Sequence, residues 1–239
     1  MIKKKIPTPE SIFKLLLSAF LLLNIACKKE HSEIQDMPYI QPKVSDIDGN
    51  IYRIVQIGTQ IWMKENLRVT KLNDGTAIPF IANETEWSQT DEPAYTWFNN
   101  EERKYGSRYG CLYNWHTVSS EKLCPTGWHV PTNDDWLTLT NYLGGDSIAG
   151  GKMKVAGTLY WEAPNEGATN ESGFSALPGG HRNHKGEFIC CTHGGLFWSS
   201  NEYTNPNSAY HLSIWYVYTS ALLRFNDKKV GFSVRCLKD

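Results

Sequence analysis

The 239-residue sequence lacks the features on which several classes of protein depend. Its longest apolar run, LLLSAFLLLNIA at residues 15–26, has twelve residues, fewer than the roughly 20 that a membrane-spanning helix needs. GxSxG, HExxH, P-loop and GxGxxG motifs are all absent. Because these motifs place nucleophiles, catalytic zinc, phosphates and dinucleotides in many enzymes, the sequence predicts a non-enzymatic protein.

An excess of positive charge is also missing. Without residues 1–26 the chain keeps 20 basic and 24 acidic residues, so its net charge is near −4. A nucleic-acid partner needs a basic face. We therefore predict no nucleic acid among the ligands.

The N-terminus is typical of an export signal. Lys3, Lys4, Lys5 and Lys14 form a basic region before a short apolar segment, which predicts a signal peptide over residues 1–26. The segment ends in Asn24-Ile25-Ala26-Cys27, which resembles the lipobox of bacterial lipoproteins. The resemblance implies a lipid-modified Cys27 and a protein anchored in the outer membrane or at the cell surface. An ordinary signal peptide with an unmodified Cys27 is the alternative.

The rest of the chain divides into a tether and one domain. Residues 27–41 are polar and have no hydrophobic period, which predicts a flexible tether. Residues 42–239 are enough for one domain with a substantial core. All nine tryptophans lie beyond residue 60, and most of them are expected to be buried.

Local patterns predict two helices and many short strands. Residues 44–63 alternate apolar and polar positions around two turns, which favours antiparallel strands. A first short helix is expected over residues 112–122 and a second over 132–143, where Thr132 can cap the N-terminus. A brief strand is expected between them, at residues 128–130. The later strands are predicted at residues 159–161, 173–177, 186–191, 196–199, 210–218, 222–225 and 230–236. Together these elements predict an α+β domain.

Several motifs in register resemble one bacterial family. They are DIDGNIYRIVQIGTQIWMKENL (46–67), YGCLYNW (109–115), CPTGWHVPTNDDW (124–136), NEGATNESGFSALPGG (165–180), FWSS (197–200) and GFSVRC (231–236). These motifs resemble the Fibrobacter succinogenes major paralogous domain. The resemblance implies an exported lipoprotein with a C-type lectin-like fold, built of two short helices, antiparallel sheets and long loops.

The same resemblance implies a disulfide between Cys124 and Cys236, because lectin-like domains join the first helical region to the last strand. Export makes the bond chemically permissible. Two reduced buried cysteines are the alternative. Cys111, Cys190 and Cys191 are left over, and Cys111 paired with Cys190 or Cys191 stays open alongside free thiols.

Two possible metal sites are alternatives to a binding domain without cofactors. Glu162, Asn165 and Glu166 offer oxygen ligands for calcium, although Ala163 interrupts the lectin EPN pattern. A copper-dependent oxidase of the formylglycine-generating type would need Cys190 and Cys191 together. Neighbouring side chains on a strand point to opposite faces, which disfavours that enzyme.

The expected contact surface is the loop-rich half of the domain, which consists of residues 71–108 and 160–207. The candidate ligand-binding residues within it are Trp161, Asn165, Glu166, His181, Arg182 and Trp198. The expected partner is a glycan or a protein of the cell envelope. A structural or adhesin-type protein without sugar dependence is the alternative from another class.

Overall fold

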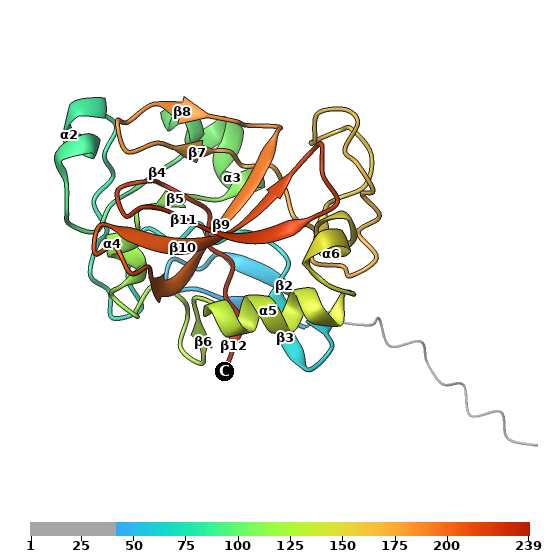
Figure 1. Ribbon diagram of the computed structural model, residues 1–239. Helices are drawn as coiled ribbons and strands as arrows, with labels where there is room; N and C mark the ends of the chain where they lie inside the picture. Colours follow the sequence, from blue (N-terminus) through green and yellow to red (C-terminus); the bar gives the residue numbers. More distant parts are fainter. Residues whose placement is uncertain (1–41) are drawn as a thin grey trace, which may run out of the picture. The chain divides into compact units, whose positions relative to one another are not determined.

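The computed structural model describes residues 42–239 (Figure 1). The predicted signal peptide, Cys27 and the tether lie outside the described residues. The domain is mixed α and β, with mostly antiparallel sheets and few helices. Within residues 42–239 no helix combines the length and apolar character needed to cross a membrane.

The larger sheet joins the two ends of the domain. Its order is β1-β2-β3-β12-β6, and its members are β1 (Lys43–Ser45), β2 (Ile51–Ile57), β3 (Gln60–Met63), β12 (Leu237–Lys238) and β6 (Trp128–His129). The predicted strands within residues 44–63 are therefore confirmed. At the tight turn between β2 and β3, Gly58 has a φ of 60°, a conformation that favours glycine.

A second sheet has the order β11-β10-β9, with β9 (Gly194–Glu202), β10 (Ser208–Trp215) and β11 (Ala221–Asp227). The predicted strands at residues 196–199, 210–218 and 222–225 fall on these three. β10 lies in the centre and is largely buried. Two small sheets pair β4 (Tyr95–Thr96) with β5 (Leu112–Tyr113), and β7 (His181–Arg182) with β8 (Phe188–Ile189).

The helices are short. They are α2 (Glu84–Gln89), α3 (Ser107–Tyr109), α4 (Trp115–Val118), α5 (Asn133–Tyr142) and α6 (Asp146–Met153), with one-turn segments η1 (Phe98–Asn100) and η2 (Glu102–Gly106). The predicted helix over residues 132–143 is confirmed as α5. Its cap is a reciprocal pair, in which the Thr132 hydroxyl accepts from the Asp135 backbone N–H and Asp135 accepts from the Thr132 backbone N–H.

Other predictions of local structure were wrong. The helix expected over residues 112–122 is only α4, because Leu112 and Tyr113 pair with β4 and Asn114 caps the helix after them. Residues 159–161 form a bend, and residues 173–177 are irregular apart from an isolated bridge between Lys154 and Ala176, so neither range is a strand. The sequence analysis also missed α6, whose Gly150 and Gly151 hide its helical pattern.

Aromatic side chains fill the core. Trp62 stacks on Trp136 with ring centroids 4.8 Å apart, and Phe174 and Phe197 pack around them. Five tryptophans are less than 2 % exposed: Trp62, Trp87, Trp136, Trp161 and Trp198. The expected burial of most tryptophans is therefore confirmed, and this packing gives the loops a rigid support.

Candidate functional site

The loops around the predicted Glu162–Glu166 ligands are held by one buried lysine. Lys154 follows α6 and is fully buried. Its Nζ donates to the backbone carbonyl oxygens of Glu166 at 2.8 Å, Trp215 at 3.1 Å and Tyr218 at 2.8 Å. Burial lowers the pKa of this amine to about 8. The contacts tie residues 155–168 to the turn after β10.

Backbone hydrogen bonds connect a third segment of the chain to these two loops. Glu166 N–H donates to the Tyr216 carbonyl at 2.7 Å, and Glu162 N–H donates to the Thr192 carbonyl at 2.8 Å. Tyr216 N–H donates to the His193 carbonyl at 2.9 Å. Residues 155–168, 190–193 and 215–219 thus form one connected surface, which we call the loop surface.

Close packing of α6 supports this arrangement. A Cβ on Gly150 would lie 2.2 Å from the Ser220 carbonyl oxygen, and a Cβ on Gly151 would lie 2.5 Å from that of Gly167. Only glycine permits such an approach of helix backbone to loop backbone. The two glycines that disguised the helix in the sequence therefore bring it against the loop surface.

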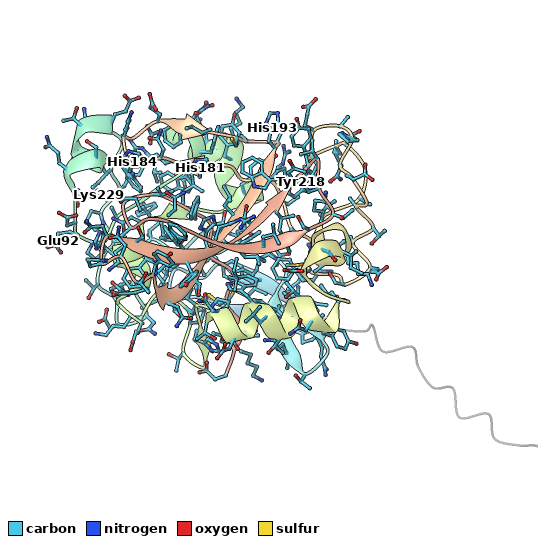
Figure 2. The ribbon with its side chains drawn as sticks, in the orientation of Figure 1. Glu92, His181, His184, His193, Tyr218 and Lys229 are labelled. Atoms are coloured by element: carbon cyan, nitrogen blue, oxygen red, sulfur yellow. A yellow bond between two sulfur atoms is a disulfide. The ribbon has the colours of Figure 1, made fainter. Side chains whose placement is uncertain are left out.

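The loop surface exposes large apolar side chains. Leu159 is 82 % exposed, Tyr218 60 % and Val217 39 %. The carboxylates of Glu162 and Glu166 are exposed on the same segment as Leu159. Figure 2 shows His193 and Tyr218 on one side of the domain, and the His193 ring meets the Tyr216 ring edge-on at 4.9 Å. No sequence pattern predicted that Lys154 would be buried in the site. Leu159 was expected to lie in a strand and not on an exposed loop.

Two candidates, Trp161 and Asn165, lie beneath this surface. Trp161 is 1 % exposed and its Nε1 donates to the Ala176 carbonyl. Asn165 is 5 % exposed, and its Nδ2 donates to the carbonyls of Val155 and Gly157. These side chains shape the loop from inside. Their expected role as ligand contacts is corrected, because burial removes them from the surface.

Arg182 and Trp198 are buried elsewhere and need the same correction. The Arg182 guanidinium donates hydrogen bonds to the backbone carbonyl oxygens of Ile81, Ala82 and Gly186. It also packs against the rings of Trp87 and Phe188. Trp198 is fully buried, and its Nε1 donates to the Tyr113 carbonyl at 2.7 Å. Both side chains hold the backbone in place. Of the six candidates, Glu166 is the one with an exposed side chain.

His181 is half-buried on β7 and pairs with Ile189 of β8, just before residues 190–193 of the loop surface. Its ring packs edge-on against Phe232 at 5.6 Å, and burial lowers its pKa to about 4. Its Nδ1 is buried without a hydrogen-bond partner in the described part of the chain. A neutral, packed imidazole fits a structural role better than a ligand contact.

The residues that could hold a metal are not assembled into a cluster. Among residues 42–239 no three or more His, Cys, Asp or Glu side chains converge in a way that could hold an ion. Glu162 and Glu166 are exposed, and the Asn165 Oδ1 between them is buried with no hydrogen-bond partner among residues 42–239. Cys190 and Cys191 are half-buried free thiols, and burial raises the pKa of both.

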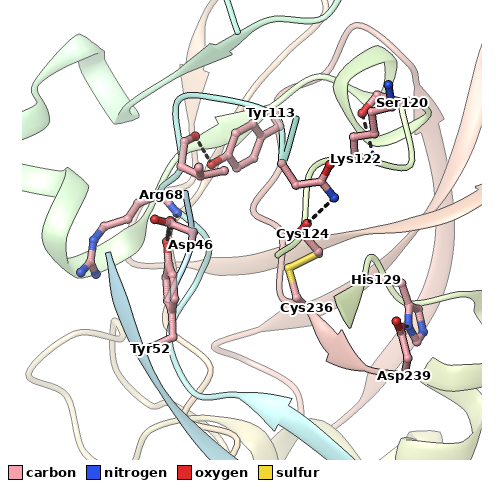
Figure 3. The surroundings of a disulfide bond; sticks show 12 residues. Asp46, Tyr52, Arg68, Tyr113, Ser120, Lys122, Cys124, His129, Cys236 and Asp239 are labelled. Carbon is pink, nitrogen blue, oxygen red and sulfur yellow. Dashed lines mark hydrogen bonds and ion pairs between the residues drawn. A yellow bond between two sulfur atoms is a disulfide. The ribbon is translucent and has the colours of Figure 1, made fainter. Parts of the chain in front are cut away.

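The disulfide expected between Cys124 and Cys236 is present (Figure 3). It ties the segment before β6 to the segment before β12. Beside it, His129 lies between two carboxylates, with Nδ1 2.6 Å from Asp239 Oδ1 and Nε2 3.2 Å from Asp135 Oδ2. Cys111 is buried and free, so it is not paired with Cys190 or Cys191.

Comparison with known families places the chain. The model of the Fibrobacter succinogenes major domain matches residues 55–238, which include the three-stranded sheet, both cysteines of the disulfide and the loop surface. The chain belongs to this family. No curated protein and no solved structure matches it. For this member of the Fibrobacter succinogenes major domain family, the exposed residues of its own structure are the basis for inferring function.

Proposed function

We propose that the protein is a non-enzymatic, lipid-anchored lipoprotein of the outer membrane or cell surface that recognises a partner through the loop surface. The observation that carries the proposal is the exposure of Leu159, Val217 and Tyr218 on segments that Lys154 fixes from below. Rigid exposed apolar side chains lose little conformational entropy on binding. They are also typical of interaction sites.

A protein partner suits this surface better than a glycan. Leu159 and Val217 are aliphatic, and protein interfaces bury such side chains together with tyrosine in their centres. A glycan ligand held through calcium would use Glu162 and Glu166. The sugar-binding alternative therefore stays linked to those two carboxylates.

A C-type lectin-like fold is part of the proposal. The order of α4, Cys124, β6, α5 and a final strand region holding Cys236 supports it. Folds of this type carry variable loops on a rigid scaffold, which suits recognition and not one fixed chemistry.

The lipid anchor rests on the sequence around Cys27. Growth of the producing cells with labelled palmitate is expected to label the full-length protein, and Cys27→Ala is expected to remove the label. Label that persists in the Cys27→Ala protein would contradict the anchor. This result is independent of what the domain binds.

Site-specific photocrosslinking tests the partner. The full-length protein is produced in intact cells with p-benzoylphenylalanine in place of Tyr218, or of Tyr142 as the control. Tyr142 is 65 % exposed, close to the 60 % of Tyr218, but lies on α5. A protein adduct formed from position 218 and not from 142 is the expected result. Adducts from both positions, or from neither, would contradict the proposal.

The same experiment separates the alternatives. An adduct with twice the mass of the protein indicates self-association and an adhesin-type role. A glycan array with the full-length protein, in calcium and then in EDTA, tests sugar binding. Binding that EDTA removes and that Glu162→Gln and Glu166→Gln weaken would restore the calcium–sugar site.

A further inference from the structure

The three-stranded sheet extends beyond the helix that covers it. Leu212 and Ile214 of β10 are buried in the core cluster that includes Trp136 and Leu139 of α5. Two residues before Leu212, on the same face of β10, Tyr210 is only half-buried. The first residue of α5, Asn133, donates its backbone N–H to Asn201 Oδ1 at 2.7 Å, so this end of the helix meets the end of β9.

Three aromatic rings occupy the uncovered end. Tyr210 pairs directly with Phe225 across β10 and β11. Tyr203, just after β9, stacks on Phe225 with ring centroids 3.9 Å apart and planes 5° apart, and Tyr210 meets Tyr203 edge-on at 5.2 Å. Phe225 remains 52 % exposed. We call Tyr203, Tyr210 and Phe225 the aromatic ledge.

The ledge is rigid. The Tyr203 backbone N–H donates to the Ser208 carbonyl at 3.0 Å, which extends the β9–β10 hairpin. The Lys228 backbone N–H donates to the Asn207 carbonyl at 2.9 Å, which fastens the hairpin tip to the chain after β11. The stacked rings are therefore carried by paired backbone and not by a loose loop.

Two amide side chains lie near the Tyr203 end of the ledge, because Asn201 is two residues before Tyr203 and Asn133 hydrogen-bonds to Asn201. Asn133 Oδ1 accepts from the Ser199 hydroxyl at 2.8 Å, and Asn201 Oδ1 accepts from the Asn133 backbone. Neither Nδ2 has a hydrogen-bond partner among residues 42–239, so both remain available as donors. On β11, Asp227 lies two residues after Phe225 and pairs with Ser208, so it is on the same face of the sheet as the ledge.

We propose that the aromatic ledge binds a neutral polysaccharide, with one pyranose ring lying on the exposed ring of Phe225. A pyranose has an apolar face of C–H groups that packs on an aromatic ring, whose face carries partial negative charge. Its hydroxyl groups need donors at the edge of the ring, and the Nδ2 groups of Asn133 and Asn201 supply them. The negative charge of Asp227 on the face of the ledge favours a neutral sugar over an acidic one.

This inference goes beyond the proposed function, because it concerns a different surface and a different class of ligand. The ledge consists of residues 203, 210 and 225. The loop surface consists of residues 155–168, 190–193 and 215–219. Either site can be lost by substitution without change to the other. The two proposals therefore fail separately.

Affinity gel electrophoresis with the full-length protein tests the ledge. The gels contain xylan, hydroxyethylcellulose, mixed-linkage β-glucan or dextran, one in each gel. Retardation by at least one of these polysaccharides is expected, in calcium and in EDTA alike. Phe225→Ala is expected to weaken the binding about tenfold, because it removes one aromatic platform.

Matched variants separate binding from folding. Phe225→Trp keeps a flat ring and is expected to retain binding, whereas Tyr142→Ala removes a somewhat more exposed ring from α5 and is expected to bind as the wild type does. Unchanged thermal unfolding of Phe225→Ala shows that its fold is intact. No retardation in any of the four gels, or equal retardation of wild type and Phe225→Ala, overturns the proposal.

Discussion

Two histidines, the buried His211 and the half-buried His181, make the fold sensitive to acid. His211 is 4 % exposed and packs against Phe232 at 4.5 Å, and the Nδ1 atoms of His181 and His211 have no partner in the described part of the chain. Burial lowers their pKa from 6.5 to about 4 for His181 and about 3 for His211. Between these values and 6.5 the unfolded chain binds protons that the folded chain does not. The free energy of unfolding is therefore greatest above pH 6.5 and falls as the pH drops toward 4.

The substitution His211→Phe tests this linkage. It keeps a ring against Phe232 but removes one group that binds a proton only on unfolding. The fall in unfolding free energy per pH unit is expected to decrease by up to about 1.4 kcal/mol between pH 6 and pH 4.5. Urea unfolding followed by tryptophan fluorescence at several pH values measures it. His184→Phe, at an exposed position, is the control, and an unchanged slope in His211→Phe would contradict the linkage.

The individual site residues show what sequence reasoning can recover. Trp161 and Arg182 are candidates because they lie in the loop-rich part of the chain, where contact residues are expected. Their burial depends on partners such as Ala176 and Ile81, which no local pattern reveals. Leu159 is apolar but exposed, whereas Lys154 carries an amine but is buried, which is the reverse of the usual arrangement. Hydrophobicity alone therefore predicts the reverse of what the loop surface exposes.

The helix α5 depends on its first turn for stability. The Thr132 hydroxyl and the Asp135 carboxylate satisfy each other's backbone N–H groups. Thr132→Ala removes one half of this pair and is expected to lower the free energy of unfolding by about 1 kcal/mol. Thr132→Ser keeps the hydroxyl and is expected to stay close to the wild type. Denaturant unfolding of both variants checks the prediction, and equal losses would assign the effect to the lost methyl group.

Elements were predictable where their determinants are local. Helix α5 has its cap, acidic first turn and apolar spacing within a dozen residues, so the sequence sufficed. Residues 112–113 also fit a helical pattern, but they pair with β4, about sixteen residues earlier in the chain. Helix α6 contains Gly150 and Gly151, which lower helix propensity and are needed for contact with distant loops. In both cases a tertiary contact overrode the local preference.

The whole domain is closed by one covalent bond. Cys124 and Cys236 are 112 residues apart in the sequence, and both are buried. The bond lies beside β12, whose neighbours in the sheet are β3 and β6. A loop of this length removes much of the freedom of the unfolded chain, which corresponds to up to about 4.7 kcal/mol of stability in the chain-entropy description.

Reduction therefore destabilises the domain without removing the contacts that form the loop surface. Dithiothreitol is expected to lower the free energy of unfolding of the wild type by about 3 to 5 kcal/mol. The double variant Cys124→Ala, Cys236→Ala is expected to be equally destabilised. Its free energy of unfolding is expected to stay the same when the reductant is added. Guanidinium unfolding with mass analysis of alkylated cysteines measures both. Reduced wild-type protein with an unchanged midpoint would contradict this role. Because Lys154 and backbone bonds hold residues 155–168 and 215–219, protein that stays folded after reduction is expected to keep the crosslink from position 218.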